Sequence, residues 1–131
     1  MAKIAVFWNW RAECKNKHLF GLMKSLLSSY HAASWSGFAM MISSYKKLAT
    51  GLATFQAGNG HDKHYPPNAE EVIYVVRGQS QQELKDQIFE MKAGDSIHIP
   101  KGAIHWTQNV GKGELEILVV FSSPTPETVG L

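Results

Sequence analysis

Several features that would assign a protein to a class at once are scarce in this chain. Cys14 is the only cysteine in the sequence, which excludes an internal disulfide and fits a reducing compartment. No apolar stretch approaches the roughly twenty residues that a transmembrane helix requires. The short apolar segment at 4–8 soon meets Asn9 and Arg11, which is unlike a signal peptide. These absences predict a soluble, cytoplasmic protein with no membrane partner.

An excess of charge of one sign is also missing. The chain has 13 Lys and Arg against 11 Asp and Glu, a formal net charge of +2, and its lysines form only short clusters. Such clusters are typical of a solvated face, so we expect no nucleic-acid partner. With 131 residues, of which 44% are hydrophobic, the chain is long enough for one core and short for two. We therefore expect a single domain over 1–131.

What the chain has in quantity is short segments of β type, separated by Gly, Pro, Asn and Asp. Segments rich in β-branched or aromatic residues lie at 4–8, 38–45, 48–57, 72–76, 81–84, 87–91, 96–99, 104–109 and 115–121. Many short strands without a long linker predict an all-β fold, a sandwich or a barrel. Lys85 and Asp86 have the right length for a tight hairpin turn.

Two segments are less clear. Over 18–30 the apolar residues recur at helical spacing, but Gly21 and the serines that follow interrupt the pattern, so helix and strand both stay open, and a short N-terminal helix is one outcome. The segment 122–130 contains Pro124 and Pro126 and is predicted to be a tail that lies over the surface.

One acidic residue opens a strongly apolar strand. Glu71 precedes the run 72–76, and alternation places it on the same face as Ile73 and Val75. If that face lines a barrel, the carboxylate points inward, and burying it unpaired costs on the order of several kcal/mol. The sequence therefore predicts a cationic group beside Glu71.

Two glycine-framed segments contain the remaining chemistry. The first, 58–78, has Gly58, His64, Glu71 and Gly78, and the second, 94–109, has Gly94, Pro100, Gly102, His105 and Asn109. These spacings resemble the two motifs of the cupin superfamily. The second motif is matched in full, whereas the first departs at one position, where Pro66 stands in place of the family's second histidine. The fifteen residues between Gly78 and Gly94 equal the short spacing of compact bacterial cupins. The resemblance covers 58–109 and implies a jelly-roll β-barrel.

The same resemblance implies a metal ion inside the barrel, held by His64, Glu71 and His105. Two imidazoles and one carboxylate suit Fe(II), Mn(II), Ni(II), Co(II) or Zn(II) and leave coordination positions open. Pro66 cannot coordinate. His61 lies three residues before His64, which puts the two on opposite faces of a regular strand unless a bulge or loop at 58–60 intervenes. Water or substrate is therefore the favoured fourth ligand.

Several functions remain open for such a barrel, because the scaffold hosts many chemistries. The favoured one is an enzyme whose metal acts as a Lewis acid on a small oxygenated compound, in lyase, isomerase or cyclase chemistry. An Fe(II) dioxygenase would use the same ligands, and a binding module with a weakened or lost metal site would catalyse nothing. The candidate side chains are His61 and His98, with Tyr74 as a weaker one, for proton transfer, and Gln56, Met40 and Trp106 for the lining of a pocket. The resemblance also implies a homodimer, with the aromatic residues at 7–10 as a contact.

Overall fold

The computed structural model describes residues 30–35 and 38–131. Within these residues the chain forms strands and no helix, so the prediction of an all-β fold is confirmed. The predicted strand at 4–8 and the undecided segment 18–30 lie outside the described residues, except that Tyr30 opens the first strand. In the described part of the chain, no helix is long and apolar enough to cross a membrane.

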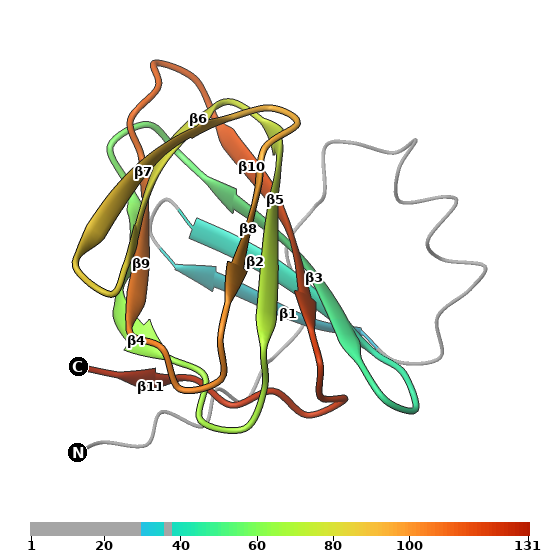
Figure 1. Ribbon diagram of the computed structural model, residues 1–131. Coiled ribbons are helices and arrows are strands. Elements are labelled where there is room, and N and C mark those ends of the chain that lie inside the picture. The colour runs from blue at the N-terminus through green and yellow to red at the C-terminus, as the bar shows by residue number, and fades with distance from the viewer. Residues whose placement is uncertain (1–29, 36–37) are drawn as a thin grey trace.

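The strands form two antiparallel sheets that face each other as a jelly-roll barrel (Figure 1). The six-stranded sheet has the order β1-β2-β3-β10-β5-β8, and the five-stranded sheet has the order β11-β4-β9-β6-β7. The strand bounds are β1 Tyr30–Trp35, β2 Phe38–Ser44, β3 Ala49–Phe55, β4 Gly60–Tyr65, β5 Glu71–Arg77, β6 Gln79–Leu84, β7 Gln87–Lys92, β8 Ser96–Ile99, β9 His105–Asn109, β10 Leu115–Phe121 and β11 Val129–Gly130.

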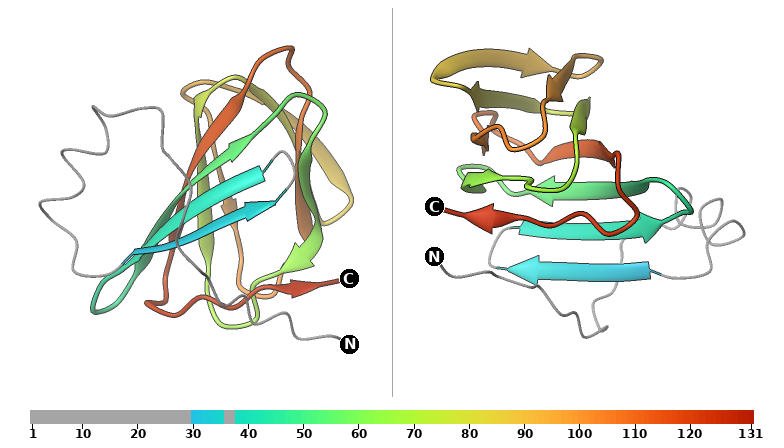
Figure 2. Two further views of the ribbon diagram at one scale, coloured as in Figure 1. Left: turned by 180° about the vertical axis from the view of Figure 1, so that it is seen from behind. Right: turned by 60° about the horizontal axis from the view of Figure 1, so that its bottom comes forward.

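Most strands fall where β-branched and aromatic residues predict them, but β1, β4 and β11 were not predicted as strands. β4 has the sequence GHDKHY, which lacks the apolar alternation that marks a strand in the sequence. The prediction of a surface tail at 122–130 is wrong at its end, because Val129 and Gly130 pair with Tyr65 and His64 at the edge of the five-stranded sheet. Figure 2 shows this last segment running alongside β4. The C-terminal residues thus cover the outer edge of a strand that carries two of the histidines.

The predicted hairpin turn is present between β6 and β7. Leu84 pairs with Gln87, so that only Lys85 and Asp86 connect the two strands. Both residues have positive φ angles, of 50° and 65°, as a two-residue turn that matches the twist of the strands requires.

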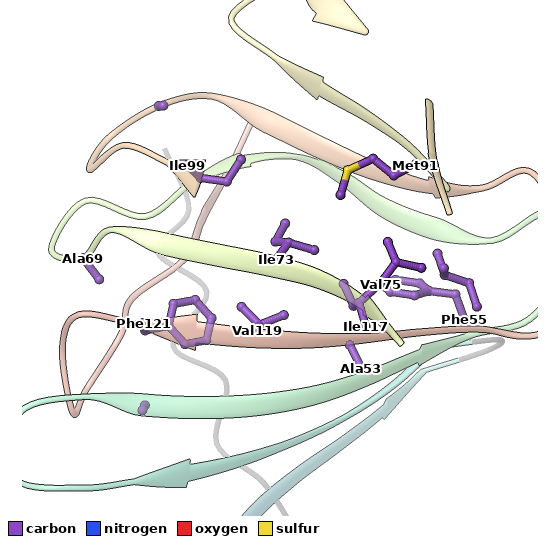
Figure 3. Packing of buried hydrophobic residues seen from close by; sticks show 13 residues of the cluster. Ala53, Phe55, Ala69, Ile73, Val75, Met91, Ile99, Ile117, Val119 and Phe121 are labelled. Atoms are coloured by element: carbon purple, nitrogen blue, oxygen red, sulfur yellow. The ribbon is translucent and has the colours of Figure 1, made fainter. Parts of the chain in front are cut away.

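The apolar core lies against the inner face of the six-stranded sheet. Ile73 and Val75 on β5 are opposite Val119 and Ile117 on β10, and all four are at most 3% exposed. Figure 3 shows these side chains together in one layer with Phe55. Alternation puts Glu71 at the end of the same inward row, as the sequence predicts, and Glu71 is buried at 6% exposure.

The inner face of the five-stranded sheet is polar instead. The buried polar residues on β6 and β9 occupy alternate positions and include Ser80, Gln82, His105, Thr107 and Asn109. Buried polar groups must be paired or serve another purpose, since leaving them unpaired is costly. Because one inner face is apolar and the other is polar, most of the candidate functional side chains lie on the five-stranded sheet.

Candidate metal centre

Three buried side chains from three strands meet between the two sheets. His64 comes from β4, His105 from the adjacent strand β9, and Glu71 from β5 of the opposite sheet. One ligand atom from each residue lies within 4.8 Å of those of the other two. His64 and His105 are register partners, and their ring centroids are 4.1 Å apart. The residues predicted to hold a metal are therefore brought together inside the barrel.

The backbone fixes the orientation of both imidazoles. His64 Nδ1 is 2.6 Å from the carbonyl oxygen of Asp62, and His105 Nδ1 is 3.0 Å from that of Ala103. A carbonyl oxygen only accepts, so each Nδ1 carries the hydrogen and donates it. Each Nε2 is then left with its lone pair available for a metal, the arrangement that metal-binding histidines commonly show.

The third ligand is aligned with this pair. His105 Nε2 lies 3.2 Å from Glu71 Oε2, but it has no hydrogen-bond partner of good geometry among the described residues. A buried nitrogen left in this state beside a buried carboxylate fits a cation that would bind both atoms. The donor set and its burial therefore suit a divalent transition metal with two nitrogen ligands and one oxygen ligand.

Burial and mutual repulsion keep two of the histidines neutral. Burial is the main cause that lowers the pKa of His64 to about 3, and the nearby rings of His61 and His105 add to it. Burial also lowers the pKa of His61 to about 4, with His105 contributing. For His105, burial lowers the pKa, but the Glu71 carboxylate and the Ala103 carbonyl outweigh it, so the pKa is raised. The Glu71 carboxylate thus favours positive charge at this place, and a metal cation would be favoured for the same reason.

His61 lies beside the triad, in contrast to what regular alternation predicts. Its register partner is Thr107 and that of His64 is His105, with a register shift between His61 and His64. This bulge leaves Asp62 and Lys63 exposed and turns both histidines to the same face. The rings of His61 and His64 are stacked, with centroids 3.7 Å apart. The bulge that the sequence would need at 58–60 lies instead between residues 61 and 64.

The structure places the other two candidates for proton transfer away from the triad. His98 is exposed on β8 and its Nε2 is 2.7 Å from Glu70 Oε2. Tyr74 is 41% exposed, on the face of β5 opposite to Ile73 and Val75. Of the three residues named from the sequence for this role, only His61 contacts the triad.

The predicted lining residues are divided between the inside and the outside of the barrel. Met40 packs against the core. Gln56 is exposed and its Nε2 donates to Glu114. The indole of Trp106 donates to Glu83, and Glu83 also pairs with Lys63 at 2.7 Å. Trp106 alternates with His105 and Thr107, so it lies on the outer face of the sheet.

Two buried polar residues near the triad were missed by the sequence reasoning. Gln82 is fully buried on β6, and the hydroxyl of Thr107 donates to its Oε1 at 2.8 Å. Thr107 lies two residues after His105, so alternation in the sequence already places the two on one face. The position of Gln82 depends on the pairing of β6 with β9, which no local pattern in the sequence encodes.

Comparisons with known proteins show which family this chain is similar to. Residues 51–121 match the family model described as "Cupin domain". The polyketide synthase CurC of Streptomyces cyaneus is 29% identical over 112 residues, which are 86% of this chain and 66% of that protein. Oxalate oxidase GF-3.8 of Triticum aestivum is 27% identical over 115 residues, which are 80% of this chain and 48% of that protein.

A solved structure shows the same architecture. Oxalate decarboxylase of Lactobacillus farciminis, in complex with formate, superposes with a TM-score of 0.73 and 25% identity, over 78% of this chain and 33% of that one. This chain thus spans about two thirds or less of the length of these relatives. The family model covers more than half of the chain. This chain belongs to the cupin family.

Proposed function

We propose that the protein is a metal-dependent enzyme that acts on a small oxygenated compound by lyase, isomerase or cyclase chemistry. The observation that supports it best is the buried set of His64, Glu71 and His105, whose ligand atoms lie within 4.8 Å of one another. A single divalent ion bound there would supply a Lewis acid that stabilises negative charge developing on an oxygen of the substrate.

The protein's own residues would then do the rest. His64 and His105 are held in one orientation by Asp62 and Ala103, so the site is organised before any ligand arrives. The apolar layer of Ile73, Val75 and Val119 excludes water from the interior. His61, stacked on His64, is the side chain in position to accept or return a proton.

The relatives support small-molecule chemistry of this kind. The names of three of them refer to a polyketide synthase, an oxalate oxidase and an oxalate decarboxylase, and polyketides and oxalate are both oxygenated compounds. Because one of these relatives is named as an oxidase, an oxygen-dependent enzyme is a variant of this proposal, with Fe(II) or Mn(II) bound by the same ligands.

We also propose that the protein is cytoplasmic and dimeric. Exposed apolar residues on the outer face of β5, such as Val72 and Val76, support self-association.

A binding function without catalysis is the second candidate, and it is favoured by one observation. Pro66 stands where the family has a second histidine, and it is fully buried, so no ligand comes from that position. Three ligands hold a metal less tightly than four, and a weak site would suit a barrel that only stores or carries a small molecule.

Metal analysis of the purified protein separates the candidates. After growth with metal in excess, the enzyme should retain close to one equivalent of a divalent transition metal per chain. Less than about a tenth of an equivalent would favour the binding module. The metal-loaded enzyme is then incubated with a panel of oxo-acids, and product formation is followed with and without oxygen. Turnover without oxygen uptake supports the Lewis-acid enzyme, whereas stoichiometric oxygen uptake supports the dioxygenase.

A further inference from the structure

A row of polar side chains continues from the triad along the inner face of the five-stranded sheet. Thr107 is two residues beyond His105 on β9, and its register partners are His61 on β4 and Gln82 on β6. Paired residues of an antiparallel sheet point to the same face. His61, Thr107 and Gln82 form what we call the polar row, which lies about 7 Å along the strands from the row of His64 and His105.

One end of the polar row touches the triad. The ring of His61 stacks on that of His64 with centroids 3.7 Å apart, although their backbone positions belong to different rows. The bulge in β4 produces this contact by turning both rings inward. A molecule bound at the triad and extended along β9 would therefore pass His61 and reach Thr107 and Gln82.

The other end of the polar row holds a buried donor in need of an acceptor. The Gln82 side chain is 0% exposed, and Thr107 Oγ1 donates to its Oε1 at 2.8 Å. This bond fixes the carboxamide, and its Nε2 has no hydrogen-bond partner in the described part of the chain. A carboxamide nitrogen carries two hydrogens, and burying them unpaired lowers stability. Sites that recognise a substrate oxygen retain such a donor because the substrate pairs with it.

We propose that Gln82 is a specificity-determining residue that donates a hydrogen bond from Nε2 to a second oxygen of the substrate, while the first oxygen lies at the triad. Thr107 is a positioning residue. Its bond to the carboxamide oxygen of Gln82 orients that group so that the nitrogen, and not the oxygen, faces the substrate. This proposal rests on the proposed function, because it takes the triad as the place of the first oxygen.

The geometry also restricts the class of substrate. The backbone positions of the two rows are about 7 Å apart along the strands, which favours a molecule whose two oxygens sit on carbons several bonds apart. The substrate class is therefore a small acid or ketone that carries a second carbonyl or carboxylate several bonds from the first. A hydroxyl at that place is less suitable, because its oxygen can accept from the amide nitrogen but its own hydrogen would need a further acceptor.

The test measures binding of four matched acids to the Mn(II)-loaded protein by titration calorimetry. Pentanoate has one carboxylate only, whereas 4-oxopentanoate and glutarate add a distant oxygen function. The fourth probe, 2-oxopentanoate, places its second oxygen next to the first, where both can reach the metal. Each probe is measured with the wild type and with Gln82→Met, Thr107→Val and Ser80→Ala. Ser80→Ala is the matched control, since Ser80 Oγ is also buried and without a partner among the described residues, one row further from the triad.

The wild type should bind 4-oxopentanoate or glutarate about fivefold to tenfold more tightly than pentanoate, the usual effect of one hydrogen bond. Gln82→Met should abolish this preference, Thr107→Val should reduce it, and Ser80→Ala should retain it. The preference for 2-oxopentanoate should persist in all four proteins. Should Gln82→Met not fold, the loss in Thr107→Val decides the question.

The outcomes separate the two proposals. If Mn(II) binds but no distant oxygen is preferred, or the preference survives both Gln82→Met and Thr107→Val, the role of Gln82 is refuted and the proposed function stands. If the wild type binds no Mn(II), Fe(II), Co(II), Ni(II) or Zn(II), the proposed function fails, and this proposal fails with it.

Discussion

At the scale of single residues, the candidate metal site depends on how two backbone carbonyls orient two imidazoles. The Nδ1 atoms of His64 and His105 are both occupied by carbonyl groups two residues earlier in the chain, those of Asp62 and Ala103. Each Nε2 is thereby directed to the centre of the barrel, and no other side chain is needed to orient the ring. A substitution at either histidine would therefore remove an imidazole from the candidate metal site but leave the strand pairing unchanged.

The first prediction concerns His105, which is 1% exposed and contacts both other members of the triad. His105→Ala should lower metal retention to less than about a tenth of an equivalent, because ligand loss removes most of the binding free energy. The far-UV circular dichroism spectrum should stay that of the wild type. The control is His98→Ala, which removes an exposed histidine from β8 and should leave metal content unchanged. Full metal content in His105→Ala would refute the assignment of the ligand.

The second prediction concerns the ligand that the family has and this chain lacks. Residue 66 lies two positions after His64, so alternation gives it the same inward direction, and Pro66 is fully buried. Pro66→His should strengthen metal binding about tenfold by adding a third imidazole. Pro66→Ala supplies the same new backbone N–H without a ligand, and we expect it to bind no better than the wild type. Equal affinities of the two variants, measured by competition with a chelating dye, would show that position 66 does not reach the metal.

At the scale of elements, β4 decides which histidines meet, and the sequence did not predict it as a strand. The resemblance to the family's motifs implied His64, Glu71 and His105, whose directions are set by strand alternation and turn glycines, and the structure brings the three together. His61 could not be placed in this way, since its direction depends on a bulge that appears only when β4 pairs with β9. The same holds for Gln82, whose neighbours are set by the register between β6 and β9. Local patterns predict the direction of a side chain within one strand, whereas register between strands is a property of the folded sheet.

The third prediction tests the close approach of β4 to β9. A Cβ atom added to Gly60 would lie 2.2 Å from the carbonyl oxygen of Thr107 and 2.6 Å from Gln108 Oε1. Gly60→Ala must therefore push the start of β4 away from β9, at a cost of about 1 to 3 kcal/mol in the free energy of unfolding. Because β4 carries His64 and β9 carries His105, metal affinity should fall as well.

The matched control for this variant is Gly113→Ala, since a Cβ added there meets nothing within 4 Å and Gly113 has no positive φ. Chemical denaturation and metal titration on both variants make the comparison. A Gly60→Ala protein as stable as Gly113→Ala would mean that β4 and β9 are not packed this closely in solution.

At the scale of the whole molecule, the triad joins the two sheets. Glu71 belongs to the six-stranded sheet, which carries the apolar core, whereas His64 and His105 belong to the five-stranded sheet, whose inner face is polar. The polar face buries less apolar surface and so contributes less to holding the sheets together. A metal bound by all three residues would add the missing connection between the two layers.

The last prediction follows from this arrangement. Metal at about 100 times its dissociation constant should raise the free energy of unfolding by about 2.7 kcal/mol, because only the folded chain assembles the three ligands. Since the ligands come from both sheets, separation of the sheets and release of the metal must coincide, and urea unfolding of the metal-loaded protein should remain a single transition at a higher midpoint. Glu71→Gln keeps the shape of the side chain but removes its charge, so the same metal concentration should give little of this gain. An equal gain in Glu71→Gln would show that the metal is held by the five-stranded sheet alone, and a second unfolding transition would show that the two sheets separate independently of it.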